Sequence, residues 1–218
     1  MMKYIIMCGG KYQWENRQLS KINGEELTAR TIRILRENGI KDICISTSNP
    51  AFKKYGVPIL THDNSYRYNP NTNAMDGYWC DAFFPTDEPT CYLFGDVYFS
   101  EQAIKTIINT ETDDIEFFAS TPNNDNEKYI KQHVEPFALK VVNTNHLKAA
   151  VAKTKELEDR NMFWRKPIMW ELWTVIKGLP LQTKPDEYDY NSYIAINDET
   201  CDVDRPGDLE QLRIMERR

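Results

Sequence analysis

Tyr4-Ile-Ile-Met-Cys-Gly-Gly-Lys11 is the stretch of this 218-residue sequence that decides the fold. Its apolar half predicts a buried strand and its two glycines predict a turn. An amphipathic pattern over 27–38 then predicts a helix, which Gly39 is placed to end. Glycines let backbone N–H groups approach an anion closely, and a nearby cation such as Lys11 or Arg17 would neutralise further phosphate charge. The stretch therefore predicts either a phosphate-binding loop or an ordinary strand-to-helix turn.

Strand and helix patterns alternate along the rest of the chain. We expect further strands over 42–46, 58–60, 90–94, 115–119, 137–142 and 193–196. We expect further helices over 74–84, 101–109, 146–158 and 168–177, and a last helix beginning at Pro206. This alternation predicts a single domain, 1–218, with a three-layer α/β/α, Rossmann-like architecture and a mostly parallel central sheet. Ligands of such sheets bind beyond the carboxyl ends of the strands.

Composition and charge exclude several classes of protein. The formal net charge is −6 and no basic block occurs, so we expect no nucleic-acid partner. No apolar stretch approaches a membrane-spanning length and no secretory leader is evident, so we expect no membrane association and a cytoplasmic location. The five cysteines form no CxxC pair and the three histidines show no ligand spacing, which argues against a zinc site.

Two acidic segments follow predicted strands. Phe94-Gly95-Asp96 places a carboxylate at the rim of the sheet, where it suits either a Mg²⁺ site or a simple helix cap. Asp202 and Asp204 alternate before the last helix, so they point to the same side if this segment is extended. One of them would then meet Asp96 and share a metal ion, or Asp204 would merely cap the last helix.

Taken in order, these segments resemble the nucleotidyltransferases of GT-A-like fold, over almost the whole chain. The matching segments are Tyr4 to Gly10, Arg17-Gln-Leu-Ser-Lys-Ile-Asn-Gly24-Glu, Gly95-Asp-Val97 and Asp202-Val-Asp204-Arg-Pro-Gly-Asp208-Leu. The family that the chain resembles includes sugar-phosphate nucleotidylyltransferases and small cytidylyltransferases. The resemblance implies a nucleoside triphosphate (NTP) bound over the glycine loop and Mg²⁺ held by aspartates.

The resemblance also implies a role for individual residues. The nucleotide-binding set would be Met7, Cys8, Gly9, Gly10, Lys11, Arg17, Gly77 and Asp96. Within that set Lys11, Arg17 and Asp96 would be catalytic, and the metal ligands would be Asp96 and Asp204, with Asp202 as second choice. Arg17 stands where the family usually has a lysine, and the loop after Gly10 lacks the usual Gly-x-Arg. Arginine keeps the charge of a lysine but not its geometry.

A late segment, Met169-Trp-Glu-Leu-Trp173, resembles the acceptor side of the small cytidylyltransferases. Trp170 and Trp173 would form an aromatic wall and Glu171 a counter-charge for a cationic or sugar acceptor. Both tryptophans suit an ordinary helix core equally well. Lys140 lies where the family often binds the acceptor phosphate, although a solvated lysine also fits there.

These observations together predict a Mg²⁺-dependent transfer of a nucleoside monophosphate from an NTP, CTP being favoured, to a phosphorylated small molecule. The N-terminal half would bind the nucleotide and the C-terminal half the acceptor. A glycosyltransferase of the same fold is a second interpretation, and a catalytically inactive nucleotide-binding protein is a third. The sequence leaves the oligomeric state open, a homo-oligomer included.

Overall fold

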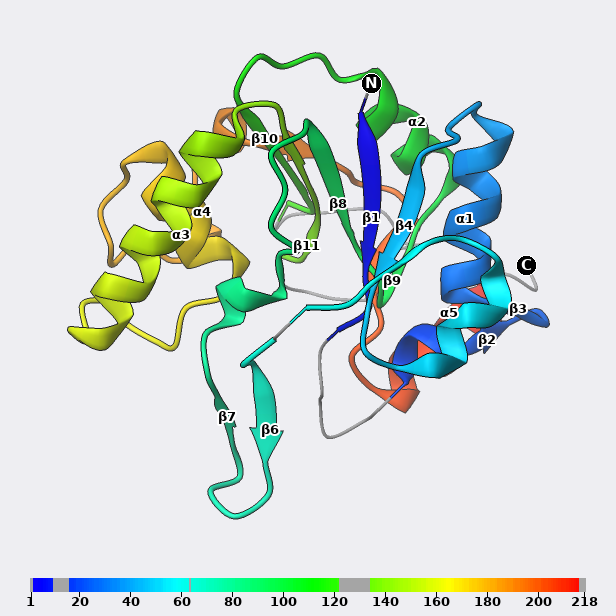
Figure 1. The fold of residues 1–218 in the computed structure, drawn as a ribbon, viewed down its shortest axis with the longest axis horizontal. Coiled ribbons are helices and arrows are strands. Elements are labelled where there is room, and N and C mark those ends of the chain that lie inside the picture. The colour runs from blue at the N-terminus through cyan, green and yellow to red at the C-terminus, as the bar shows by residue number, and fades with distance from the viewer. Residues whose placement is uncertain (1, 10–15, 63, 122–133, 216–218) are drawn as a thin grey trace.

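The structure is a computed structural model that describes residues 2–9, 16–62, 64–121 and 134–215 (Figure 1). The predicted phosphate-loop residues Gly10 and Lys11 lie outside the described residues.

A seven-stranded sheet forms the centre of the molecule, in the order β12-β10-β11-β8-β1-β4-β5. Its strands are β1 (Lys3–Met7), β4 (Ile43–Ser46), β5 (Ile59–Leu60), β8 (Thr90–Phe94), β10 (Ile115–Ala119), β11 (Pro136–Val141) and β12 (Ile194–Ala195). Only β11 runs against its neighbours among these seven strands, so the sheet is mostly parallel, as predicted. The reversal of β11 matters for the site, because its first residue lies at the edge where the parallel strands end.

Helices cover the sheet on both sides (Figure 1). They are α1 (Leu27–Glu37), α2 (Glu101–Asn109), α3 (Thr144–Asp159), α4 (Met169–Lys177) and α5 (Pro206–Met215). Helices α1 and α2 lie on one side of the sheet, and α3 and α4 lie on the other. Gly39 follows α1 with a φ of 82°, so the predicted stop is confirmed. Ser100 caps the start of α2, since its hydroxyl accepts the Ala103 N–H at 2.8 Å.

Three small strand pairs extend the fold. They are β2 (Lys21–Ile22) with β3 (Glu25–Glu26), β6 (Arg67–Asn69) with β7 (Ala74–Asp76), and β9 (Val97–Tyr98) with β13 (Cys201–Asp202). The β6–β7 hairpin projects from the body of the molecule (Figure 1). The helix predicted over 74–84 was wrong. Asn73 and Gly77 both have positive φ, which interrupts a helix, so the segment forms β7 and a short 3₁₀ turn at Trp79–Ala82.

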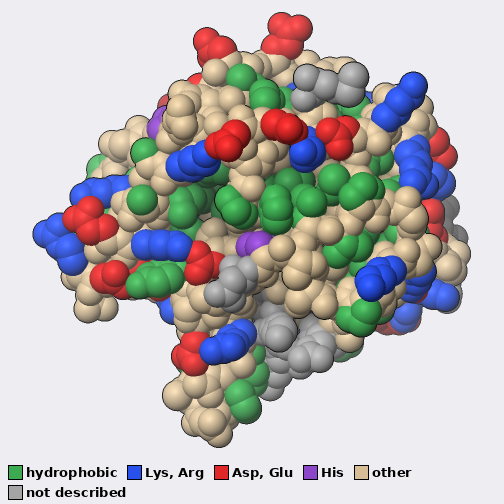
Figure 2. All heavy atoms as spheres, viewed as in Figure 1, with side chains coloured by type: hydrophobic (Ala, Val, Ile, Leu, Met, Phe, Trp, Pro, Cys, Tyr) green, Lys and Arg blue, Asp and Glu red, His purple; other side chains and the backbone are tan. Residues whose placement is uncertain are grey.

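The core is built on β1 and β8, whose side chains are almost all buried. All five cysteines are buried and free, so they pack as small apolar residues. On the face drawn in Figure 2, Lys and Arg side chains are interspersed with Asp and Glu around a band of apolar side chains. Within the described residues, the helices are too short or too polar to cross a bilayer.

Candidate functional site

A pocket of about 550 Å³ opens at the carboxyl ends of β1 and β8. Met7 and Phe94, the last residues of these two strands, pair in register and both line the pocket. Pro136 lines it too, because the antiparallel strand β11 begins at this edge. The pocket therefore lies where open α/β sheets bind their ligands.

Arg17 joins two of the predicted metal ligands inside this pocket. It opens a short 3₁₀ helix, Arg17–Leu19, and its side chain is 8% exposed. Its Nη1 donates to Asp204 Oδ1 at 2.7 Å, and its Nη2 donates to Asp96 Oδ2. Charge-assisted bonds of this kind fix a guanidinium firmly. The sequence analysis assigned Arg17 to the phosphates and Asp96 and Asp204 to a metal ion, and the structure brings the three residues into contact.

The small pair β9–β13 brings Asp204 next to Asp96. Asp202 pairs with Val97, and the Val203 N–H donates to the Asp96 carbonyl at 3.0 Å. The carboxylate that caps α5 belongs to Asp208, which accepts the N–H groups of Asp204 and Arg205. Asp204 Oδ1 accepts from Arg17.

Gly95 lets the Asp96 corner lie against the end of β1. A Cβ at Gly95 would meet the Met7 carbonyl oxygen and the Cys8 sulfur at 2.5 Å. The Cys8 thiol is buried there, 3.9 Å from the Thr28 hydroxyl, and burial raises its pKa well above the usual range. Cys8 thus packs beneath the site as a neutral thiol, whereas Gly9 lines the pocket itself.

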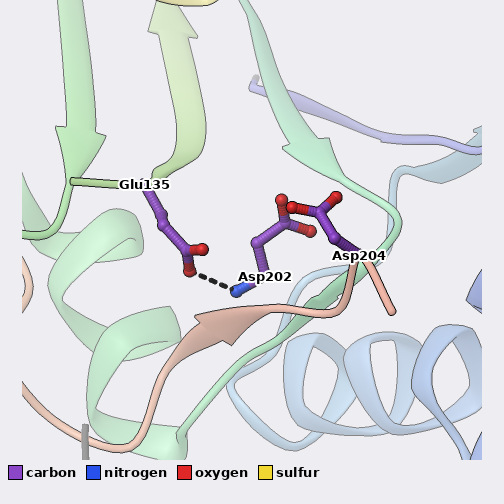
Figure 3. A group of neighbouring side chains, drawn as sticks. All are labelled: Glu135, Asp202 and Asp204. Atoms are coloured by element: carbon purple, nitrogen blue, oxygen red, sulfur yellow. Dashed lines mark hydrogen bonds between the residues drawn. The ribbon is translucent and has the colours of Figure 1, made fainter. Parts of the chain in front are cut away.

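A group of three carboxylates lies beside Asp96. Glu135, Asp202 and Asp204 each place an oxygen within 4.8 Å of the others, and their side chains point toward one another (Figure 3). Oxygen-only donor sets suit hard cations such as Mg²⁺ and Ca²⁺. The residues present therefore fit a divalent cation, held by these carboxylates with or without Asp96. Asp202 and Asp204 do reach the same place, as their alternation predicted.

Sequence reasoning missed Glu135. It is buried, and its Oε2 accepts the Asp202 N–H at 2.9 Å, while its backbone is bonded twice to Ser120. In a parallel sheet, functional residues are expected directly after the carboxyl ends of strands. Glu135 instead directly precedes a strand, β11. Only the knowledge that β11 runs backwards would have pointed to the residue that precedes it.

The charges of the described pocket lining are unbalanced. Five carboxylates, those of Asp96, Glu135, Asp186, Asp202 and Asp204, face two guanidinium groups, those of Arg17 and Arg165. Like charges in a partly buried site repel one another and are stabilised by cations. The arrangement thus favours ligands that bring positive charge, such as a metal ion carried with a polyphosphate.

The predicted acceptor residues have separate locations. Trp170 lines the pocket, whereas Trp173 is fully buried beside Phe117 and is not part of the lining. Glu171 is buried and bonded to Arg165 and the Ile168 N–H. Of these predicted residues, the structure brings only Trp170 to the pocket directly.

Lys140 and Gly77 also lie away from the pocket lining. The Lys140 ammonium donates to the carbonyls of Ile107, Ile108 and Thr110 at 2.6–3.0 Å, near the opposite end of the sheet. Burial lowers the pKa of Lys140. Gly77 has a φ of 73°, and a Cβ there would lie 2.2 Å from the Ser65 carbonyl oxygen. Glycine is therefore needed there for chain packing.

No protein-family model matches the sequence, and no curated protein matches it either. The fold matches solved structures over the whole chain. 4-Diphosphocytidyl-2C-methyl-D-erythritol synthase from Anaerococcus prevotii is 13% identical with a TM-score of 0.60, and the match covers 100% of this chain and 99% of that one. CTP:phosphocholine cytidylyltransferase from Streptococcus pneumoniae is 16% identical, with a TM-score of 0.53 and 99% coverage of both chains.

The inositol-1-phosphate CTP transferase from T. maritima is 12% identical with a TM-score of 0.52, covering 99% of this chain and 96% of that one. Each of these proteins has a name that describes the transfer or synthesis of a cytidylyl compound. Together these likenesses show that the chain has the fold of small-molecule nucleotidyltransferases, which confirms the fold that the resemblance implies.

Proposed function

We propose that this protein is a Mg²⁺-dependent nucleotidyltransferase. It would transfer a nucleoside monophosphate from an NTP to a phosphorylated small molecule, such as a sugar phosphate or a phosphocholine-like alcohol phosphate, and release pyrophosphate. The observation that carries the proposal is the joint placement of Arg17, Asp96 and Asp204 in one pocket at the carboxyl ends of β1 and β8. We favour CTP because three of the similar structures carry cytidylyl or CTP names, while another, from Bacillus anthracis, is named a putative glucose-1-phosphate thymidylyltransferase, which makes dTTP the second choice.

The pocket residues suit the two halves of this reaction. Gly9, Arg17 and Asp96 come from the N-terminal half and would face the NTP, with Lys11 and Gly10 as further contacts. Trp170 and its neighbours come from the C-terminal half and would face the acceptor. One domain, 1–218, would thus carry the whole site. Since NTPs are made in the cytoplasm, we place the reaction there.

In the reaction, an oxygen of the acceptor phosphate attacks the α-phosphorus of the NTP. The bond from that phosphorus to its bridging oxygen breaks, and the electron pair leaves with pyrophosphate. The protein contributes mostly position and charge. Arg17 would move from the carboxylates to the phosphate oxygens and neutralise charge on the leaving group.

Asp96 and Asp204, with Asp202 and Glu135 alongside, would hold the metal ion. When bound, Mg²⁺ supplies positive charge to the phosphate oxygens. The excess of carboxylates in the pocket explains why an NTP would bind with a cation rather than alone.

Pyrophosphate release tests the proposal. The purified protein is incubated with Mg²⁺, each of the four NTPs, and a panel that includes glucose 1-phosphate, phosphocholine and phosphoethanolamine. We expect one pair to give pyrophosphate and a product with the mass of the nucleotidylated acceptor, and chelation of Mg²⁺ to abolish both. Nucleotide binding without turnover on a broad panel would support the non-catalytic interpretation. Glycosyl transfer from a nucleotide sugar would support the glycosyltransferase.

A further inference from the structure

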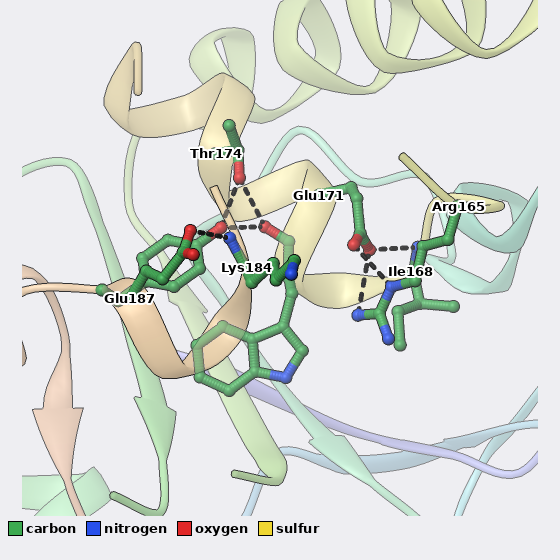
Figure 4. A network of polar contacts seen from close by, with 8 residues as sticks. Arg165, Ile168, Glu171, Thr174, Lys184 and Glu187 are labelled. Carbon is green, nitrogen blue, oxygen red and sulfur yellow. Dashed lines mark hydrogen bonds and ion pairs between the residues drawn. The ribbon is translucent and has the colours of Figure 1, made fainter. Parts of the chain in front are cut away.

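Glu171 is a buried carboxylate at the start of α4. Its described hydrogen bonds come from two groups, the Ile168 N–H and the Arg165 guanidinium. Its side chain is 2% exposed. It accepts the Ile168 N–H at 3.0 Å, which caps the helix, and the Arg165 Nε–H at 2.6 Å (Figure 4). A longer contact of 3.4 Å joins it to Arg165 Nη2. A buried carboxylate requires such partners, because it has left its hydration shell behind.

Arg165 also lines the pocket. Its side chain is one-third exposed, and the residue lines the pocket together with Trp170. Glu171 uses the Nε and Nη2 edge, and no acceptor within the described part of the chain bonds to Nη1. The guanidinium carbon stands 4.6 Å from the ring centre of Trp164. Arginine carries five N–H donors in a rigid fork, so donors remain for a planar or tetrahedral anion.

Tyr66 lines the same pocket as Arg165 and Arg17. Burial raises the pKa of the Tyr66 hydroxyl, and the positive charges of Arg165 and Arg17 both act in the opposite direction. Tyr66 therefore lies within electrostatic reach of two guanidinium groups that come from different parts of the chain. Arg17 belongs to the sheet edge, with Asp96 and Asp204, whereas Arg165 belongs to the segment before α4.

We propose that Arg165 binds the phosphate group of the acceptor and that Glu171 is the residue that positions it. This inference rests on the proposed function and names the acceptor's recognition group. Arg17 lies with the proposed metal ligands, so Arg165 is the other guanidinium of the described pocket lining and the one available to a second phosphate. Glu171 is bonded to Arg165 and lies outside the described pocket lining, so in this proposal it acts through Arg165 instead of facing a cationic acceptor directly. The acceptor is thus recognised through its phosphate, whatever the rest of it carries.

Kinetics of Arg165 variants test the inference. Arg165→Ala and Arg165→Lys are compared with Arg160→Ala, which removes an exposed, ion-paired arginine outside the pocket lining. We expect Arg165→Ala to raise the acceptor KM at least about tenfold, Arg165→Lys to raise it less, and both to keep the CTP KM within about twofold. Arg160→Ala should change neither. An increase in the CTP KM alone would assign Arg165 to the nucleotide and overturn the inference.

Direct binding separates this inference from the proposed function. Glucose 1-phosphate and phosphocholine are titrated by calorimetry into protein saturated with Mg²⁺ and a non-hydrolysable CTP analogue. Weaker binding to Arg165→Ala with intact binding of the analogue supports the inference. Equal binding by wild type and Arg165→Ala, in a protein that does transfer nucleotides, overturns the inference alone. A wild-type protein that binds neither the analogue nor the acceptors overturns both.

Glu171→Gln tests the positioning role. Glutamine keeps the volume and can still accept the Ile168 N–H, but it loses the charge that holds Arg165. We expect a three- to tenfold rise in acceptor KM, an unchanged kcat, and a double variant whose acceptor KM is no higher than that of Arg165→Ala alone. A lower melting temperature with an unchanged acceptor KM would mean that the pair only stabilises the fold, and would overturn the assignment.

Discussion

Arg17 donates a hydrogen bond to Asp204 across 187 residues of chain, with Nη1 and Oδ1 2.7 Å apart. The same guanidinium donates to Asp96. The group expected to bind phosphate and the groups expected to bind a metal ion therefore bind one another in this structure. A divalent cation at the proposed site would compete with Arg17 for the same carboxylates, so nucleotide that draws Arg17 away would also make room for the metal ion.

This competition predicts opposite effects of one substitution on two ligands. Arg17→Gln should strengthen the binding of Mn²⁺ to the nucleotide-free protein by about five- to tenfold, because two carboxylates lose their cation. The same change should weaken the binding of a non-hydrolysable CTP analogue, because a phosphate contact is lost. Calorimetry with each ligand measures both.

Arg205→Gln is the matched control for Arg17. Arg205 follows Asp204 directly and its side chain is exposed, so its loss changes the nearby charge equally without removing a described contact to Asp96. If Arg205→Gln strengthened Mn²⁺ binding as much as Arg17→Gln, the effect would be one of general charge. Unchanged Mn²⁺ and nucleotide affinities in Arg17→Gln would reduce Arg17 to a structural ion pair.

Asp96→Ala should lower turnover by at least about 100-fold, because it removes a charge proposed to hold the metal ion. Arg17 keeps Asp204 as a partner, so we expect the variant to fold. The rate is measured at saturating substrates, beside circular dichroism and a melting curve. Asp42→Asn, near the opposite end of the sheet, is the control for loss of one negative charge. A folded Asp96→Ala protein with near-normal turnover would refute the assignment.

Much of the fold could be predicted from the sequence because local chemistry decides it. The apolar run of β1 and the glycine after α1 each produced the expected element. The direction of β11 could not be predicted, since strand polarity depends on which neighbours it pairs with rather than on its own residues. The helix predicted over 74–84 failed because positive φ at Asn73 and Gly77 cannot be seen in an apolar pattern.

Some residues of the candidate site could likewise be predicted from the sequence and others could not. Asp96, Asp202 and Asp204 follow strands, so a rule about strand ends finds them. Glu135 precedes a strand and Arg165 precedes a helix, and neither stands out in the sequence. Glu135 is buried and bonded to a residue distant in sequence, and Arg165 is bonded to a buried carboxylate at the start of α4. Only the folded chain provides these partners. Lys140 shows the reverse case, in which a plausible position meets backbone carbonyls instead of the pocket.

Lys140→Met should destabilise the protein without altering acceptor binding. The ammonium donates to three carbonyls, and its loss leaves buried acceptors unpaired, at a cost of about 2–4 kcal/mol. The melting temperature should fall by several degrees, while the acceptor KM stays constant. Lys105→Met, an exposed lysine on α2, serves as the control. A raised acceptor KM in Lys140→Met with no loss of stability would restore the acceptor role.

Trp170 and Trp173 should separate into a pocket residue and a core residue, although they lie one turn apart on α4. Trp173 is fully buried against Phe117, so Trp173→Ala should cost about 3–5 kcal/mol and leave the acceptor KM unchanged. Trp170 packs against Phe117 as well, but it also lines the pocket beside Arg165.

The phenylalanine variants distinguish the two roles because they retain most of the apolar volume. Trp170→Phe should raise the acceptor KM by about three- to tenfold with a modest loss of stability, since the ring that borders the acceptor becomes smaller. Trp173→Phe should lower the melting temperature and leave the KM of both substrates unchanged. The indole N–H of Trp173 has no hydrogen-bond acceptor within the described part of the chain, so its removal adds no further cost. If Trp170→Phe lowered only the melting temperature, both tryptophans would be core residues. Helix α4 would then affect acceptor binding only through Glu171, which positions Arg165.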